Sequence, residues 1–166
     1  TGKATGTDGD GIFAQNGYGY EGNVYGTFTI LTINAATTKG GRYGIYAKNY
    51  GTGALSITTT GDTTGNTDGI SAYNKGSDLT IDAATTTGGK NGILAQNFGS
   101  GALSITTTGD TTGNRDGISA YNKEGTSLTI NATDTEGGRN GIFAQNKGTG
   151  ALSITTTGKT TGGTGH

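Results

Sequence analysis

The sequence contains no cysteine, proline, methionine or tryptophan, and only 29% of its 166 residues are hydrophobic. Without cysteine, the chain has no disulfide framework and no thiolate metal site. It lacks an apolar run of the roughly 18 residues that a membrane span needs, and it does not begin with an apolar signal peptide. Because 11 basic residues stand against 12 acidic ones, no net charge draws the whole chain to nucleic acid or to an anionic membrane.

Glycine is abundant, with 35 residues, and a unit of about 24 residues is repeated six times. The Leu-x-Ile part of the unit begins at Leu31, Leu55, Leu79, Leu103, Leu128 and Leu152. A Gly-Ile-x-Ala-x-Asn hexad begins at Gly11, Gly44, Gly69, Gly92, Gly117 and Gly141. Low hydrophobicity with much glycine is also typical of disordered chains, but a disordered chain does not keep Leu-x-Ile in register. The fixed period is typical of a solenoid.

Apolar residues in the unit alternate with a period of two, which indicates β-strands. Ile45 and Ala47 show this alternation in the hexad, and Leu55 and Ile57 show it in the second segment. The connections are too short and too rich in glycine and threonine for helices. The sequence therefore predicts an all-β, single-stranded parallel β-helix (β-solenoid) with about 24 residues per coil, three sides and six to seven coils. The third side is a narrow polar strand within 62–66.

Residues that stay the same in every copy are expected to point inward, because stacked coils require identity there. The final asparagine of each hexad is expected to form a ladder along the stack. Its members are Asn16, Asn49, Asn74, Asn97, Asn122 and Asn146. Residues 1–166 are predicted to be a single array and an excerpt of a longer one, since both ends lie at the same phase of the repeat. Residues 17–29, with four aromatic residues, form an inserted loop in the first coil.

The repeat resembles a known family. Gly-Ile-Tyr-Ala-Lys-Asn followed by Gly-Ala-Leu-Ser-Ile-Thr-Thr-Thr-Gly, with Asp-Gly-Ile-Ser-Ala-Tyr-Asn in alternate coils, is similar to repeat arrays in the passenger domains of bacterial autotransporter adhesins. The resemblance implies a right-handed β-helix at the extracellular surface of a Gram-negative cell, acting in adhesion or self-association. No catalytic residue of that family carries over to this chain.

Neither catalysis nor metal binding is expected. Asp62 and Asp110 occupy equivalent turns two coils apart, and two coils span ~9.6 Å, which is too far for shared-proton chemistry. We expect no enzyme activity, no catalytic or metal-ligating residues and no cofactor.

A basic column precedes the hexads at Arg42, Lys90, Arg115 and Arg139. Asp68 and Asp116 beside it are expected to neutralise much of its field.

The outward side of the hexad is the predicted binding face, because a core does not need ranks of exposed aromatic residues. The candidate binding residues are Phe13, Tyr46, Tyr50, Tyr73, Leu94, Phe98, Tyr121 and Phe143. The alternative is that aromatic residues merely favour strands and pack across coils. The two interpretations stay open on sequence alone.

Three functions follow from these patterns. The leading hypothesis is a structural and adhesive module that binds itself, a surface receptor or a glycan, with no nucleic-acid partner and no membrane insertion in this segment. End-to-end assembly into filaments is a second, because an uncapped β-helix exposes unpaired strand backbone. Ice binding is a third. It rests on outward Ser and Thr ranks such as Ser104, Thr106 and Thr108, which Asp82 interrupts.

Overall fold

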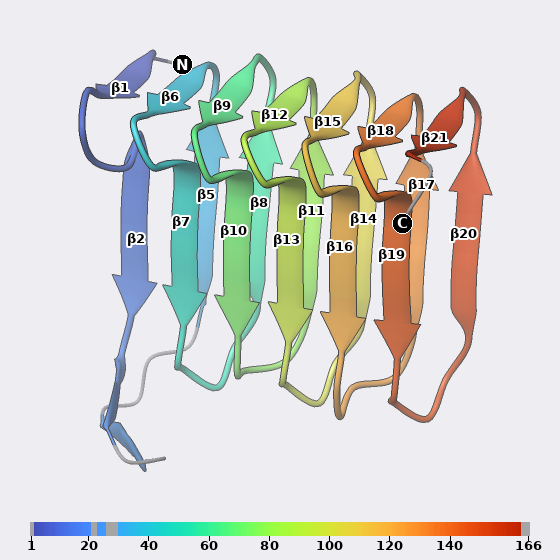
Figure 1. Ribbon diagram of the computed structural model, residues 1–166. Coiled ribbons are helices and arrows are strands. Elements are labelled where there is room, and N and C mark those ends of the chain that lie inside the picture. Colours follow the sequence, from blue (N-terminus) through green and yellow to red (C-terminus); the bar gives the residue numbers. More distant parts are fainter. Residues whose placement is uncertain (1, 21–22, 26–29, 164–166) are drawn as a thin grey trace.

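The computed structural model describes residues 2–20, 23–25 and 30–163. Within these ranges the chain forms 21 β-strands and no helix. All but two of the strands belong to three parallel sheets, and each coil of the chain contributes one strand to each sheet in turn. The sheets are stacked as a β-solenoid (Figure 1).

We name the sheets after their sequences. The Thr-Gly sheet consists of β1 (Ala4–Gly6), β6 (Thr38–Gly40), β9 (Thr63–Gly65), β12 (Thr86–Gly88), β15 (Thr111–Gly113), β18 (Thr135–Gly137) and β21 (Thr160–Gly162). The hexad sheet consists of β2 (Ile12–Asn16), β7 (Tyr43–Asn49), β10 (Asp68–Asn74), β13 (Asn91–Asn97), β16 (Asp116–Asn122) and β19 (Asn140–Asn146). The Leu-Ile sheet consists of β5 (Leu31–Ala35), β8 (Leu55–Thr59), β11 (Leu79–Ala83), β14 (Leu103–Thr107), β17 (Leu128–Ala132) and β20 (Leu152–Thr156).

Figure 1 shows the path of one coil. A hexad strand runs down the front, a Leu-Ile strand returns up the back, and a short Thr-Gly strand crosses the top to the next coil. Viewed from the N-terminal end, this path turns clockwise as it moves away, so the coil is right-handed, as parallel connections almost always are. The predicted three-sided β-solenoid of about 24 residues per coil is therefore confirmed, and so is its narrow third strand.

The core is a thin stack of identical side chains. The isoleucine of the hexad and the leucine and isoleucine of the Leu-Ile strand are fully buried in the central coils, as in Ile93, Leu103 and Ile105. Parallel pairing in register places each of them on its equivalent in the next coil. Burial of each such side chain contributes about 1.5 to 3 kcal/mol. The stacking of equivalent residues therefore supplies the hydrophobic stabilisation of the whole array.

The first glycine of the hexad is required by a close approach between two sheets. A Cβ atom on Gly92 would lie 2.7 Å from the Cγ2 methyl of Thr111 and 2.6 Å from the carbonyl oxygen of Gly117. The buried threonine of the Thr-Gly strand thus packs its methyl group where a larger residue would place its side chain. Gly44 and Gly69 have the same arrangement, and Gly141 approaches the methyl group of Thr160 in the same way. This contact fixes the Thr-Gly sheet against the hexad sheet.

The predicted asparagine ladder is confirmed. The Nδ2 group of each of the first five hexad asparagines donates to the Oδ1 atom of the equivalent residue in the following coil, with distances of 2.8–3.0 Å. Asn97 also donates to the carbonyl of Gly101 and accepts the backbone N–H of Gly99. The ladder therefore satisfies the backbone of the turn that leads to the Leu-Ile strand.

The predicted insertion at 17–29 contains two short strands. β3 (Tyr18–Tyr20) and β4 (Asn23–Tyr25) pair antiparallel, which makes them a hairpin between β2 and β5. Gly17, at its start, has a φ of 76°, a conformation that glycine adopts without steric cost. Residues 21–22 and 26–29, including Phe28, lie outside the described residues.

Candidate binding surface

The outward side of the hexad sheet carries three parallel columns of side chains. The first column contains Phe13, Tyr46, Ser71, Leu94, Ser119 and Phe143. The second contains Gln15, Lys48, Tyr73, Gln96, Tyr121 and Gln145. The third, one residue past each strand, contains Tyr50, Lys75, Phe98, Lys123 and Lys147. The eight predicted residues thus share one side of one sheet but are divided among three columns.

Four of the predicted residues form a continuous chain of aromatic rings, which we call the ring chain: Tyr50, Tyr73, Phe98 and Tyr121. The ring centroids are 5.6 Å apart from Tyr50 to Tyr73, 5.1 Å from Tyr73 to Phe98, and 5.8 Å from Phe98 to Tyr121. The rings alternate between the second and third columns, so the chain zigzags across four successive coils. These distances and tilted planes are those of favourable aromatic pairs.

A second, smaller cluster lies at the N-terminal side of the sheet. Tyr46 packs on Phe13 with a centroid distance of 5.6 Å and stacks on Tyr43 at 4.7 Å. Tyr43 was not among the predicted residues. The signal for it was present, because Tyr43 occupies a position where the later coils carry Asp or Asn. Phe13 is 57% exposed.

The remaining two predicted residues are separate from both clusters. Leu94 lies between the serines Ser71 and Ser119 in the first column, and it is partly buried. Phe143 follows Ser119 in the same column and is exposed. No aromatic pair among the described residues includes Phe143.

Three rings of the chain have a lysine beside them, and sequence reasoning missed these cations. The Nζ atom of Lys75 lies 5.7 Å from the Tyr50 ring centroid, and that of Lys123 lies 5.7 Å from Phe98. Lys147 lies 5.5 Å from the ring of Tyr121. In the smaller cluster, Lys48 and Arg42 lie over tyrosine rings in the same way. The alternation of aromatic residue and lysine just after the hexad was the available signal.

A shallow groove of about 430 Å³ connects the two clusters. Its lining includes Tyr43, Tyr46, Tyr50, Tyr73, Lys90 and Asp68. Partial burial raises the pKa of both Tyr43 and Tyr73, and nearby charge from Asp68 adds to the effect at Tyr43. These phenols therefore stay neutral at physiological pH and act as hydrogen-bonding groups in a groove that polar side chains such as Ser71 and Gln96 also line.

The arginines of the basic column before the hexads are paired with carboxylates, at Asp116 as expected but at Asp10 instead of Asp68. Arg42 pairs with Asp10 at 3.1 Å. Arg115 and Arg139 both pair with the buried carboxylate of Asp116 at 3.0 Å. The arginines of this column are therefore held by internal ion pairs, unlike Lys75 and Lys147 beside the ring chain.

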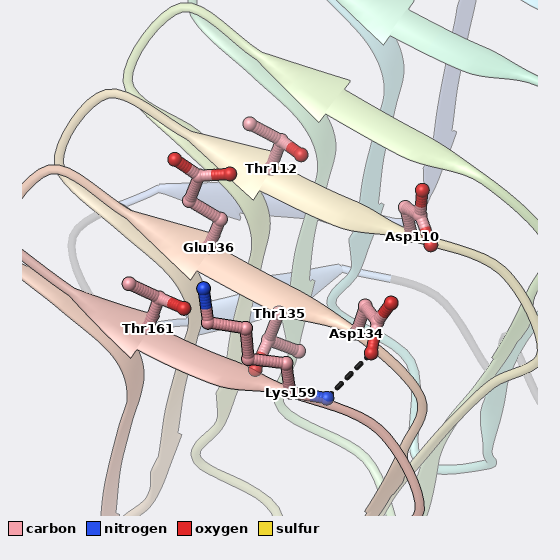
Figure 2. A pocket seen from close by; sticks show the side chains of 7 residues that line it. All are labelled: Asp110, Thr112, Asp134, Thr135, Glu136, Lys159 and Thr161. Carbon is pink, nitrogen blue, oxygen red and sulfur yellow. Dashed lines mark hydrogen bonds between the residues drawn. The ribbon is translucent and has the colours of Figure 1, made fainter.

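An acidic corner lies where Leu-Ile strands lead into Thr-Gly strands. Figure 2 shows a pocket there with the carboxylates of Asp110, Asp134 and Glu136 around its rim, and its volume is about 200 Å³. The side chain of Asp134 accepts the backbone N–H of Lys159. Among the described residues, no group of three or more His, Cys, Asp or Glu side chains could hold a metal ion.

The outward side of the Leu-Ile sheet carries the Ser and Thr ranks. Ser104 pairs in register with Thr80 and Thr129, so hydroxyl groups follow one another along the axis. In the neighbouring column, Asp82 lies beside Thr106 and is exposed. The register of the ranks is as predicted, and so is the interruption by charge.

No protein-family model, no curated protein and no solved structure matches this chain. Within the part of the chain that the structure describes, no helix has the length and apolarity that a membrane span requires.

Proposed function

We propose that this chain is a non-catalytic adhesive module of a bacterial cell surface, and that it binds a surface ligand or other copies of itself through the ring chain. The observation that carries the proposal is the unbroken contact of Tyr50, Tyr73, Phe98 and Tyr121 across four coils. The resemblance of the repeat to autotransporter passenger arrays favours the same function and the extracellular location.

The fold itself does not require these rings. Gln96 occupies the same column as Tyr73 and Tyr121, on a strand with the same pairing and the same buried isoleucine, alanine and final asparagine. Lys75 and Lys123 occupy the same column as Phe98. Polar side chains therefore suffice at these positions, and the partly exposed edges of the rings are available for contact with a partner.

The scaffold is suited to an extended partner. Each ring packs against its neighbours in the chain, and Tyr73 and Tyr121 lie on strands that are paired on both sides, so little side-chain freedom is left to lose on binding. The four rings span three coil steps, or about 14 Å. A surface of this shape favours a flat or elongated ligand over a small molecule held in a deep pocket.

The test replaces Tyr73 and Tyr121 by glutamine, the residue that the same column carries at Gln96. We expect the double variant to keep its circular dichroism spectrum and to lose both self-association in sedimentation and adhesion of protein-coated beads to cells. The matched control is Thr58→Ser with Thr106→Ser on the Leu-Ile sheet. Unchanged adhesion and self-association in the folded Tyr variant would remove the ring chain as the binding surface.

Ice binding is a second candidate, favoured by the register of the Ser and Thr ranks on the Leu-Ile sheet. A regular array of small hydroxyl groups on a flat sheet can order water. Asp82 opposes this function, because a strongly hydrated carboxylate lies within the array. Thermal hysteresis that disappears in Thr106→Lys would establish ice binding, and its absence at millimolar protein would dismiss it.

A further inference from the structure

We propose that the ligand of the ring chain is an acidic polysaccharide that lies along the solenoid axis. This inference rests on the proposed adhesive function and names the class of partner. Its basis is the combination, on one edge of the molecule, of aromatic rings with lysines of which only Lys123 has an ion-pair partner among the described residues, together with a cluster of acidic residues at another edge.

Three of the four lysines on this edge are free to bind an external anion. Among the described residues, no carboxylate lies within ion-pair distance of Lys48, Lys75 or Lys147. Lys123 pairs only with Glu124, whose side chain is 65% exposed. The rings attract the ammonium groups through their π faces and leave their charge unneutralised. This edge is therefore positive although the chain has a formal net charge of −1.

A group of acidic residues lies at the far side of the coil, whereas two exposed carboxylates, those of Asp78 and Glu124, lie in the turns that follow the hexad strands. The ring chain is at the ends of the hexad strands, whereas Asp110, Asp134 and Glu136 lie where Leu-Ile strands end and Thr-Gly strands begin. Figure 1 places these ends at opposite extremes of the coil. Asp68, at the start of β10, is buried and is separated from Lys75 by the length of that strand. A polyanion is therefore attracted to the ring chain and repelled from the acidic corner.

The spacing of the groups suits a chain of sugars. Tyr50 and Phe98 are two coils apart in the third column, with Lys75 between them, and Lys123 follows Phe98. One ring and one ammonium group thus recur every ~9.6 Å along the axis. This repeat is comparable with the length of a disaccharide. The apolar face of a pyranose can pack on a ring while its carboxylate or sulfate pairs with the next lysine.

A polysaccharide fits these rings better than a single-stranded nucleic acid does. The ring centroids are 5.1–5.8 Å apart and the rings touch one another, so no base can insert between them. A sugar chain needs no gap, because it lies across the outer edge of the rings. Repeated weak contacts along the axis then add up through multivalency.

The test measures binding of the 166-residue protein to polygalacturonate, dextran sulfate, neutral dextran and a single-stranded DNA oligonucleotide. We expect saturable binding to one or both acidic polysaccharides, which distinguishes carboxylate from sulfate recognition. The binding should weaken with added NaCl, because salt screens exposed charges. Neutral dextran should not bind, and the oligonucleotide should bind more weakly than the acidic polysaccharide.

Two charge-matched double variants locate the site. Lys75→Gln with Lys147→Gln should weaken polysaccharide binding about fivefold to tenfold, if each lysine contributes as an exposed ion pair does. Lys3→Gln with Lys39→Gln changes the net charge equally at exposed positions away from the ring chain, and it should change binding less than about twofold by the same reasoning. Circular dichroism and the thermal midpoint establish that both variants are folded.

Several outcomes would overturn the inference. Equal losses in the two double variants would show that only net charge matters. Tighter binding of neutral dextran or of the oligonucleotide would identify another class of partner. Adhesion that depends on Tyr73 and Tyr121, with no binding to either acidic polysaccharide, would refute the ligand class and leave the proposed function intact. Adhesion that does not depend on these tyrosines would refute the proposed function itself.

Discussion

At the scale of single residues, two aspartates in identical seven-residue segments show how neighbouring coils shift the pKa of a buried group. Asp68 and Asp116 begin the same Asp-Gly-Ile-Ser-Ala-Tyr-Asn sequence, and both side chains are buried. Burial raises the pKa of Asp68, and hydrogen bonds from Asn91 offset this only in part. Burial acts on Asp116 as well, but bonds from Asn140, Arg139 and Arg115 outweigh it and hold its pKa below the ordinary value.

Replacement of Asp68 by asparagine is expected to stabilise the protein at pH 7. The raised pKa means that the folded state binds a proton more readily than the unfolded state does. The free energy of unfolding therefore falls as the pH rises from the unfolded pKa through the folded pKa. The substitution removes this loss, and the Oδ1 atom of the introduced amide can still accept both bonds from Asn91. Urea denaturation should show a higher midpoint for Asp68→Asn at pH 7 and a smaller difference at pH 4. A lower midpoint at pH 7 would contradict this account.

Replacement of Asp116 by asparagine is expected to have the opposite effect. It leaves Arg115 and Arg139 without their carboxylate, which we expect to lower the free energy of unfolding by about 1 kcal/mol, since both arginines are partly exposed. Because the folded pKa is lowered, the contribution of Asp116 is present above the unfolded pKa and is lost as the pH falls through the folded pKa. Denaturation at pH 7 and below pH ~3.8 measures the difference, which should shrink in acid. A constant difference would mean that the ion pairs contribute nothing.

At the scale of strands, the glycine of the hexad couples two sheets. We expect Gly92→Ala to lower the free energy of unfolding by about 1 to 3 kcal/mol, because the new methyl group overlaps Thr111 and the Gly117 carbonyl. Gly9→Ala is the control, since a Cβ atom there meets no atom within 4 Å. Chemical denaturation of both variants measures the effect. Equal stability of the two would show that the close approach is not a constraint.

The strands were predictable from sequence because their signals are local. Leu55 and Ile57 alternate with Ser56 and Thr58, and this parity alone indicates which side is buried. The grouping of the aromatic and lysine side chains could not be predicted in the same way, because it depends on contacts between coils. Tyr73 meets Phe98 only because coils pair in register and because the third column continues past the strand end. Lys147 approaches Tyr121 across a coil boundary, which no single repeat reveals.

At the scale of the whole molecule, each coil is covered by the coils beside it. Leu128 and Ile130 are fully buried, whereas the equivalent Leu152 and Ile154 of the last coil are each 46% exposed. Stability is therefore a sum of contacts between neighbouring coils, as in other solenoids. The ring chain with its lysines and the acidic corner run along this stack as separate lines, although Glu124 lies beside the ring chain and Lys159 lines the acidic corner.

The same substitution should thus lower the free energy of unfolding more in the centre of the stack than in its last coil. Leu103→Ala removes a fully buried side chain and is expected to lower the free energy of unfolding by about 2 to 5 kcal/mol. Leu152→Ala should cost about 1 kcal/mol or less in this 166-residue chain, because its side chain is already half exposed. Urea denaturation of the two variants is the measurement. Equal losses would refute nearest-neighbour stabilisation.

The central claim is that the ring chain is the surface that contacts a ligand, and hydroxyl-radical footprinting of the protein bound to polygalacturonate tests it most directly. Mass spectrometry reports the oxidation of every aromatic side chain with and without the polysaccharide. The account predicts that oxidation falls at Tyr50, Tyr73, Phe98 and Tyr121 and stays unchanged in Phe13, which lies in the first column. Bound polysaccharide that leaves the four rings as reactive as in the free protein would contradict it.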